Sequence, residues 1–346
     1  MKKLVFTLFL CVSFILSGCS LITSKKNKSI IDKEEKPSVE EVTNTETSAK
    51  KAVYSPYTGE ELSEDAKDLI PFMAIIENSK LARPQSGLID ADIVFETMAE
   101  GGIPRFIALF YSSSPKVIGP IRSVRPYFLN LAEEFTLPFA HCGGSEEATL
   151  SIQKGKGKSM DESANGSSYW RDNTRKSPHN LYTSTEKLRT LITKKNFLVS
   201  PSSKLQFNKD SWDNGTFTSA KEVIIKPNKN YNTSYIYKDG KYLKSMDNEP
   251  SIDRENKKNI SVDNIIIQKT DITLQKDGLH IDIRLNGQGD GFLISQGKYK
   301  KIKWSKKDYT SPTLLTDESG KAVNLSPGKT WWHIVNKNDM IVINGD

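Results

Sequence analysis

Residues 119–127 read Gly-Pro-Ile-Arg-Ser-Val-Arg-Pro-Tyr, and the neighbouring elements are organised around this stretch. Pro126 opens a segment in which apolar residues recur at helical spacing as far as Phe135. Because proline is favoured at the first position of a helix, we expect a helix to begin there. Backbone N–H groups at a helix start lack partners and carry partial positive charge, and Arg122 and Arg125 stand directly before this one. The stretch therefore predicts an anion site.

A second helix start follows shortly afterwards. Residues 136–140 are expected to form a short strand that ends at His141, and Gly144 with its glycine neighbour permits a sharp turn. Ser145 is a good N-cap, and two glutamates follow it in the expected first turn. Strands and helices in such close succession predict an α/β layer. Because both helix starts follow strands, they are expected along one rim of the sheet.

Apolar runs before this stretch predict further strands at residues 71–76, 91–98, 105–111 and 116–121. Alternation places Asp92 and Glu96 on one face of their strand, where they would line a site or form a solvated edge. Residues 153–173 are long for a connection and have the composition of a lid or an insertion. After them, Thr183 and Glu186 form a candidate capping box for another helix.

From residue 196 onward, short β-branched runs are separated by Asn, Gly, Asp and Lys clusters. The expected strands are 223–225, 235–237, 264–267, 279–285, 291–294, 299–304, 330–335 and 340–343. The predicted fold class is therefore α+β, with an α/β layered domain over residues 53–226 and a β-rich, mainly antiparallel domain over residues 227–346. Trp331 and Trp332 point to opposite faces of a strand, so at least one is expected in the core.

The N-terminus predicts export. Two lysines precede an apolar run at residues 4–16 that is too short to span a membrane, so residues 1–18 are expected to be a signal peptide. The Leu-Ser-Gly-Cys sequence that ends at Cys19 resembles the bacterial lipobox, which implies lipid attachment at Cys19 and a membrane partner through that lipid. Residues 19–52 are rich in polar and charged residues, and we expect them to form a disordered tether.

Charge and cysteine content limit the function classes. The formal net charge is +7, and it falls by two when the signal peptide takes Lys2 and Lys3 away. This excess suits an anionic cell surface and is too diffuse to predict nucleic-acid binding. Cys142 is the one cysteine that remains besides the lipidated one, so no disulfide framework is expected within a mature chain.

The predicted anion site gathers arginines from strand ends and loops, because the guanidinium fork suits phosphate and carboxylate. Its candidate residues are Arg83, Arg105, Arg122, Arg125, Tyr127, His141, Gly144 and Ser145. The alternative is that each arginine pairs with a local acid such as Asp92, Glu96 or Glu100. Glu96 and His141 are the candidate proton acceptors if a reaction occurs, and no catalytic residue is assigned. Cys142 is not expected to act with His141, because adjacent strand residues point to opposite faces.

Metal and cofactor signals are weak. The four histidines, at positions 141, 179, 280 and 333, show no ligand spacing, so no metal site and no cofactor is predicted. Magnesium held by carboxylates and a ligand phosphate enters only with a phosphotransferase function.

Several motifs together resemble the YerB-type lipoproteins of Gram-positive bacteria. Besides the lipobox and residues 119–127, these motifs are Arg-Pro-Gln-Ser-Gly-Leu at 83–88, Ala-Asp-Ile-Val-Phe-Glu at 91–96, Glu-Gly-Gly-Ile-Pro-Arg at 100–105, His-Cys-Gly-Gly at 141–144 and Gly-Lys-Thr-Trp at 328–331. The resemblance implies a protein anchored by lipid to the extracellular face of the cell membrane. It supplies no reaction.

A second resemblance concerns chemistry. The order of Asp92, Arg122, His141 and the glycine pair is similar to that in the LytR–CpsA–Psr phosphotransferases, which move lipid-pyrophosphate-linked glycopolymers onto peptidoglycan. Their Arg-x-Asp-Thr motif is not reproduced, because Ser123 and Val124 follow Arg122.

The sequence thus favours a non-catalytic, lipid-anchored envelope protein that binds a phosphate- or carboxylate-bearing cell-wall or lipid-linked ligand. Phosphotransfer on lipid-pyrophosphate-linked glycopolymers is the second hypothesis. A scaffold for another envelope protein is the third.

Overall fold

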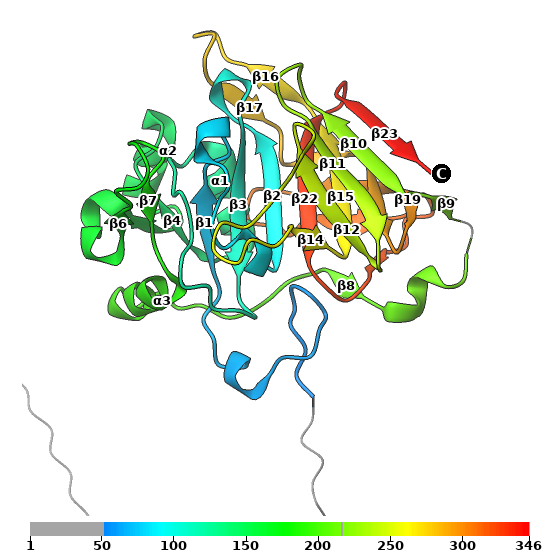
Figure 1. Ribbon diagram of the computed structural model, residues 1–346, viewed down its shortest axis with the longest axis horizontal. Helices are drawn as coiled ribbons and strands as arrows, with labels where there is room; N and C mark the ends of the chain where they lie inside the picture. The colour runs from blue at the N-terminus through cyan, green and yellow to red at the C-terminus, as the bar shows by residue number, and fades with distance from the viewer. Residues whose placement is uncertain (1–51, 216, 346) are drawn as a thin grey trace, which may run out of the picture. The chain divides into compact units, whose positions relative to one another are not determined.

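The architecture comes from a computed structural model that describes residues 52–215 and 217–345. The expected signal peptide, Cys19 and nearly all of the expected tether lie outside these residues. The described residues form one compact unit, built around a central sheet (Figure 1). This sheet has eleven strands. The strand order in this sheet is β20-β19-β18-β15-β22-β2-β3-β1-β4-β5, and β9 pairs with β19 beside this path.

The N-terminal part of the chain supplies five of the eleven strands of the central sheet. Its strands are β1 (Phe72–Ile76), β2 (Ile93–Met98), β3 (Pro104–Phe110), β4 (Pro138–His141) and β5 (Lys158–Asp161). β3 runs antiparallel to both β1 and β2, whereas β1, β4 and β5 are parallel neighbours. The apolar runs of β1, β2 and β3 are explained by burial on both faces of the sheet.

The prediction of a strand at residues 116–121 is wrong. This segment makes only isolated bridges, from Ile118 to Thr183, from Gly119 to Ser86 and from Ile121 to Ile76. Pro120 lacks the N–H group that a continuous ladder requires, so the segment contacts three different neighbours in turn.

The C-terminal part extends the same sheet. Its members are β9 (Thr218–Ser219), β15 (Asn264–Thr270), β18 (Gly287–Ser295), β19 (Lys298–Lys306), β20 (Leu314–Thr316) and β22 (Thr330–Asn336). β22 joins the two parts because it pairs in parallel with β2 on one side and with β15 on the other. Most other pairings of this region are antiparallel, as the sequence predicts.

A second sheet of six strands is antiparallel throughout. It contains β10 (Glu222–Lys226), β11 (Thr233–Lys238), β12 (Lys241–Met246), β13 (Glu249–Pro250), β14 (Ser261–Val262) and β23 (Met340–Asn344). The strands on either side of residues 227–232, β10 and β11, are neighbours in this sheet.

Three two-stranded ribbons complete the described strands. They are β6 (Trp170–Arg171) with β7 (Leu181–Tyr182), β8 (Gln206–Phe207) with β21 (Asn324–Leu325), and β16 (Ile272–Leu274) with β17 (Ile281–Ile283). The segment at 153–173 therefore carries β5 and β6 and is not one structureless connection.

In the part of the chain that the structure describes, three α-helices lie where local signals predict them: α1 (Pro126–Glu134), α2 (Glu146–Gln153) and α3 (Thr185–Lys194). Pro126 occupies the first turn of α1, and the Ser145 hydroxyl accepts a hydrogen bond from the Ala148 N–H group. The cap of α3 is Ser184, which accepts from the Lys187 N–H group, and not Thr183. Thr183 is held by its bridge to Ile118, and its hydroxyl donates to the Ser168 carbonyl.

The core has two parts, one on each face of the central sheet. On the α1 face, side chains such as Phe95 and Ile107 pack against α1 and α2. On the α3 face, side chains such as Val94 and Ala108 pack against α3 and the second sheet. Trp331 lies on the α3 face and Trp332 on the α1 face, and both are buried.

Candidate functional site

Polar residues collect where the parallel strands end. Glu77 follows β1, Cys142 follows β4 and Glu162 follows β5, so all three stand at one edge of the central sheet. Ligands of open α/β sheets bind outside the carboxyl ends of the strands. This edge is therefore the expected position of a ligand-binding site.

The two helix starts meet at this edge. Val124 and Gly144 form a parallel bridge, in which the Ser145 N–H group donates to the Val124 carbonyl at 3.2 Å. The Cys142 N–H group donates to the Arg122 carbonyl at 3.1 Å. A Cβ atom at Gly144 would lie 2.7 Å from a Val124 methyl carbon, so glycine is required for this approach. The order of the elements predicts this neighbourhood, and the structure brings the two segments together.

Arg105 and Arg125 share one carboxylate. The Arg125 guanidinium bonds to Glu100 and donates to the Val124 carbonyl at 2.8 Å. Arg105 donates to the Ser123 carbonyl at 3.0 Å and lies 3.4 Å from Glu100. Their side chains are only 12% and 15% exposed, respectively. These arginines therefore hold the loop before α1 in place, as the local-acid alternative predicts.

Tyr127 lies beside this ion-pair cluster, in the first turn of α1. Its hydroxyl is buried and has no hydrogen-bond partner among the residues that the structure describes. Burial raises the pKa of Tyr127 far above its ordinary value, with a further contribution from Glu100. Tyr127 therefore stays a neutral phenol.

Arg83 faces a different part of the molecule. Its guanidinium donates to Asp247 at 2.7 Å and to the Asn78 side chain at 3.1 Å, and it lies over the Tyr231 ring. These contacts tie the loop after β1 to the second sheet. The Arg83 guanidinium is therefore engaged by these partners.

Arg122 differs from the other three arginines. Its side chain is 30% exposed, and among residues 52–215 and 217–345 its guanidinium makes one ion pair, 3.6 Å from Nε to Glu77, and no hydrogen bond. The N–H groups on the two terminal nitrogens of Arg122 therefore remain free to donate hydrogen bonds. A planar guanidinium with free terminal N–H groups is suited to bidentate contact with an oxyanion.

Glu77 is also anchored by His179. The buried Glu77 carboxylate accepts hydrogen bonds from the Ser79 hydroxyl at 2.9 Å and lies 3.0 Å from His179 Nδ1. The sequence did not predict that Glu77 and His179 pair, because Glu77 reads as the polar end of a strand and His179 is 102 residues away. The sequence signal for Glu77 was its position directly after a buried strand.

His179 belongs to the loop at residues 172–180, which joins β6 to β7. Arg175 fixes this loop by donating to the Ala82 and Pro84 carbonyls, each at 2.7 Å. Arg254 donates to Asp172 at 2.6 Å from the other part of the chain. The loop that carries His179 is thus clamped at Asp172 and at Arg175.

Replacing Arg254 by alanine is expected to loosen this loop, because it removes the charged hydrogen bond to Asp172. Amide hydrogens of residues 172–180 should then exchange with solvent several-fold faster, whereas those of β2 should not change. Lys257→Ala, three residues from Arg254 on the chain, is the control. Equal exchange in both variants would contradict the clamp.

His141 is a structural residue of the turn. Its Nδ1 lies 2.9 Å from the Gly143 carbonyl, which only accepts, so Nδ1 carries the hydrogen. Its Nε2 accepts from the Ser159 hydroxyl at 2.7 Å. Burial lowers the pKa of His141. The imidazole is therefore neutral near pH 7, with both nitrogens in use.

Cys142 lies beside this turn, 3.6 Å from Glu162. Burial and the Glu162 carboxylate raise the pKa of the Cys142 thiol. The protonated thiol is a poor nucleophile. This result agrees with the sequence-based argument against a cysteine nucleophile.

Glu96 lies two strands from β1, level with Ile76, because both residues pair with Phe106. It shares the α3 face with Val94, whereas His141 stacks on Phe139 on the α1 face. The two candidate proton acceptors therefore stand on opposite faces of the sheet and cannot serve one ligand. The structure places Glu96 in a buried network against the second sheet, where it accepts hydrogen bonds from Thr233 at 2.9 Å and from Trp331 at 2.7 Å.

Comparisons with known proteins give the chain a family. Residues 57–198 match the N-terminal domain, and residues 222–332 the C-terminal domain, of a protein family of unknown function, DUF3048. The chain belongs to the DUF3048 family. A Bacillus subtilis (strain 168) protein named "Putative lipoprotein YerB" is 31% identical over 295 residues, which cover 82% of this chain and 87% of that protein. The crystal structure of Bacillus subtilis YerB matches with a TM-score of 0.75, over 84% of this chain and 99% of that one.

Two further observations concern only the part of the chain that the structure describes. Across residues 52–215 and 217–345, no three or more His, Cys, Asp or Glu side chains are grouped to hold a metal ion. In the same residues, no helix is long and apolar enough to cross a membrane.

Proposed function

We propose that this DUF3048 protein is a non-catalytic, lipid-anchored protein of the cell envelope that binds an anionic ligand through Arg122. The ligand would be a phosphate- or carboxylate-bearing component of the cell wall or of a lipid-linked precursor. The free terminal N–H groups of Arg122, at the edge where the parallel strands end, carry this proposal.

The other site residues have supporting roles in this proposal. Arg105 and Arg125, fixed by Glu100, shape the loop that presents Arg122. Glu77, held by His179, positions the Arg122 side chain through their ion pair. Gly144 and Ser145 bring the start of α2 against the same loop, which adds a second set of helix-start N–H groups nearby.

The sequence of residues 1–52 supports the proposed location. The lipobox-like motif that ends at Cys19 would place a lipid at the mature N-terminus, and residues 20–52 would tether the body to the extracellular face of the membrane. The name of the Bacillus subtilis relative agrees with a lipid anchor. Envelope polymers and lipid head groups are rich in anions, which suits a basic chain.

Phosphotransfer has less support. The proposed base His141 uses both nitrogens, Glu96 is on the other face of the sheet, and the Cys142 thiol is held in its protonated form. A scaffold role remains an outcome of the binding test.

The test is a calorimetric titration of the full chain, in detergent, with inorganic pyrophosphate. Arg122→Ala is expected to weaken binding about ten- to a hundredfold, because a hydrogen-bonded charge contributes about 1.5–3 kcal/mol. Arg122→Lys should bind with intermediate affinity, since it keeps the charge and loses the fork.

Lys116→Ala is the matched control, because Lys116 is an exposed cation in the segment that leads to Arg122. Unchanged binding in Arg122→Ala would remove Arg122 from the proposal. Equal losses of affinity in Arg122→Ala and Lys116→Ala would show that pyrophosphate is held by general charge attraction. No binding by the wild type would favour a protein partner.

A further inference from the structure

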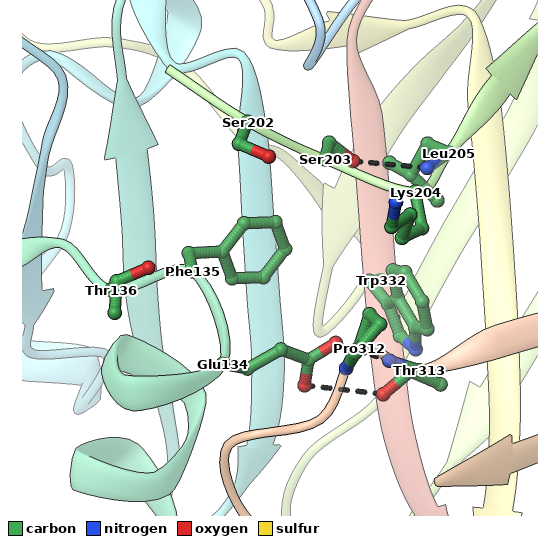
Figure 2. A pocket seen from close by; sticks show the side chains of 10 residues that line it. All are labelled: Glu134, Phe135, Thr136, Ser202, Ser203, Lys204, Leu205, Pro312, Thr313 and Trp332. Carbon is green, nitrogen blue, oxygen red and sulfur yellow. Dashed lines mark hydrogen bonds between the residues drawn. The ribbon is translucent and has the colours of Figure 1, made fainter. Parts of the chain in front are cut away.

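A cavity lies at the C-terminal end of α1. Its volume is about 130 Å³, and it is enclosed by the last turn of α1, residues 202–205, residues 312–313 and β22. Figure 2 shows the Phe135 ring projecting between Ser202 and Glu134, with Trp332 and Pro312 beside it. Arg125 and Glu134 stand at opposite ends of α1, which spans roughly 13 Å at 1.5 Å per residue. The cavity is thus separate from the Arg122 edge.

The cavity is built at the junction of the two family regions. Glu134, Phe135 and Thr136 belong to the N-terminal match, and Pro312, Thr313 and Trp332 belong to the C-terminal match. Residues 202–205 come from the stretch that joins the two matches. Binding sites for small molecules occur preferentially at such junctions.

The walls are largely apolar. Phe135, Leu205, Pro312 and Trp332 supply them, and the Trp332 indole N–H group is engaged by Gln268 at 2.9 Å. Trp332 therefore offers only ring surface to the cavity. An apolar cavity of about 150 Å³ accommodates benzene. The present volume fits a single ring or a branched chain of similar size.

The polar groups determine the charge of the ligand. The Glu134 carboxylate bonds to the Lys306 ammonium and accepts from the Thr313 N–H group at 2.7 Å and the Thr313 hydroxyl at 3.1 Å, so it is neutralised. The exposed Lys204 ammonium and the Ser202 hydroxyl have no partner among the described residues. The unbalanced charge of the cavity is therefore one positive charge at its rim.

From this arrangement we propose that the cavity binds a small monocarboxylate whose body is a single ring or a branched apolar chain. The body packs between Phe135 and Trp332, and the carboxylate reaches the Lys204 ammonium and the Ser202 hydroxyl. This site does not depend on the anion site at Arg122.

Benzoate is the probe, and the signal of the Trp332 indole N–H group in the full chain, followed by NMR, is the readout. Benzoate should shift this signal in a saturable manner. Ser202→Phe, which places a ring at the exposed mouth, should abolish the shift. Lys204→Ala should weaken binding about fivefold, the effect of one solvent-exposed ion pair. Arg122→Ala should leave the titration unchanged.

The control is Lys209→Ala, which removes an exposed cation outside the cavity. Toluene should bind with equal affinity to the wild type and to Lys204→Ala, because it lacks the carboxylate. A missing or non-saturable benzoate shift, or one that persists in a folded Ser202→Phe variant, would overturn the proposal. Equal losses in Lys204→Ala and Lys209→Ala would overturn the assignment of a carboxylate.

Discussion

Replacing Lys244 by methionine is expected to lower the free energy of unfolding by about 3–5 kcal/mol, the usual effect of removing one partner from a buried ion pair. Lys244 lies on β12, and its ammonium is buried 3.6 Å from Glu96 and 4.7 Å from the centre of the Trp331 ring. Although burial alone would raise it, Lys244 and His333 hold the pKa of Glu96 below its ordinary value. Without Lys244, this buried carboxylate loses its main counter-charge.

The double variant Glu96→Gln/Lys244→Met should recover most of this loss, because it removes both charges and keeps the volume. Lys241→Met is the matched control on the same strand, since Lys241 is 47% exposed and its pair with Asp263 should contribute less than about 1 kcal/mol. Urea unfolding measures all three variants. A Lys244→Met variant as stable as the control would refute the assigned role.

The same lysine predicts a pH dependence. Burial lowers the pKa of Lys244 from 10.5 to about 8. Between these values the unfolded chain binds more protons than the folded protein, so stability should rise as the pH increases through this window. The rise should be absent from Lys244→Met, which has no group to titrate.

Replacing Lys306 by methionine is the second change with a large expected effect, a loss of about 3 kcal/mol. Lys306 on β19 is buried, and its ammonium bonds to the buried Glu134 at the end of α1. Burial lowers the pKa of Lys306, and Glu134 counteracts that effect. In the variant, the two hydrogen bonds from Thr313 would remain as the main compensation for the Glu134 charge.

Lys303→Met is the control for Lys306, because Lys303 lies on the same strand, is 57% exposed and pairs with the exposed Asp290. Its loss should stay below about 1 kcal/mol. Thermal and urea unfolding of the two variants give the comparison. Similar stabilities for both would show that the Lys306 pair contributes no more than a surface pair.

Local signals predicted most elements of the fold. Pro126 and Ser145 marked the starts of α1 and α2, because a first-turn proline and an N-cap act through the adjacent backbone alone. The apolar runs at β1, β2 and β3 were readable because those strands are buried on both faces. The strand prediction for residues 116–121 was wrong because an apolar run does not reveal that its backbone contacts are divided among separate neighbours.

The site could be predicted only in part. Chain order placed the two helix starts on one rim, but it could not assign partners to the arginines. Arg83 pairs with Asp247, which is 164 residues away, and Glu77 contacts His179 across 102 residues. Such pairings depend on which loops the sheet brings together, and residue type carries no information about them.

By itself, the sequence determined the helix starts, most strands, the two-part α+β organisation and the resemblance to the family, because each depends on neighbouring residues or on motifs. Tertiary structure alone decided which charges are neutralised: Arg105 and Arg125 by Glu100, Arg83 by Asp247, and Glu96 largely by Lys244. The tertiary structure leaves the terminal N–H groups of Arg122 without a partner among the described residues. Alternation along a strand assigns side chains to two faces, whereas the packing of helices and sheets on those faces determines whether a carboxylate meets solvent, an arginine or a buried lysine.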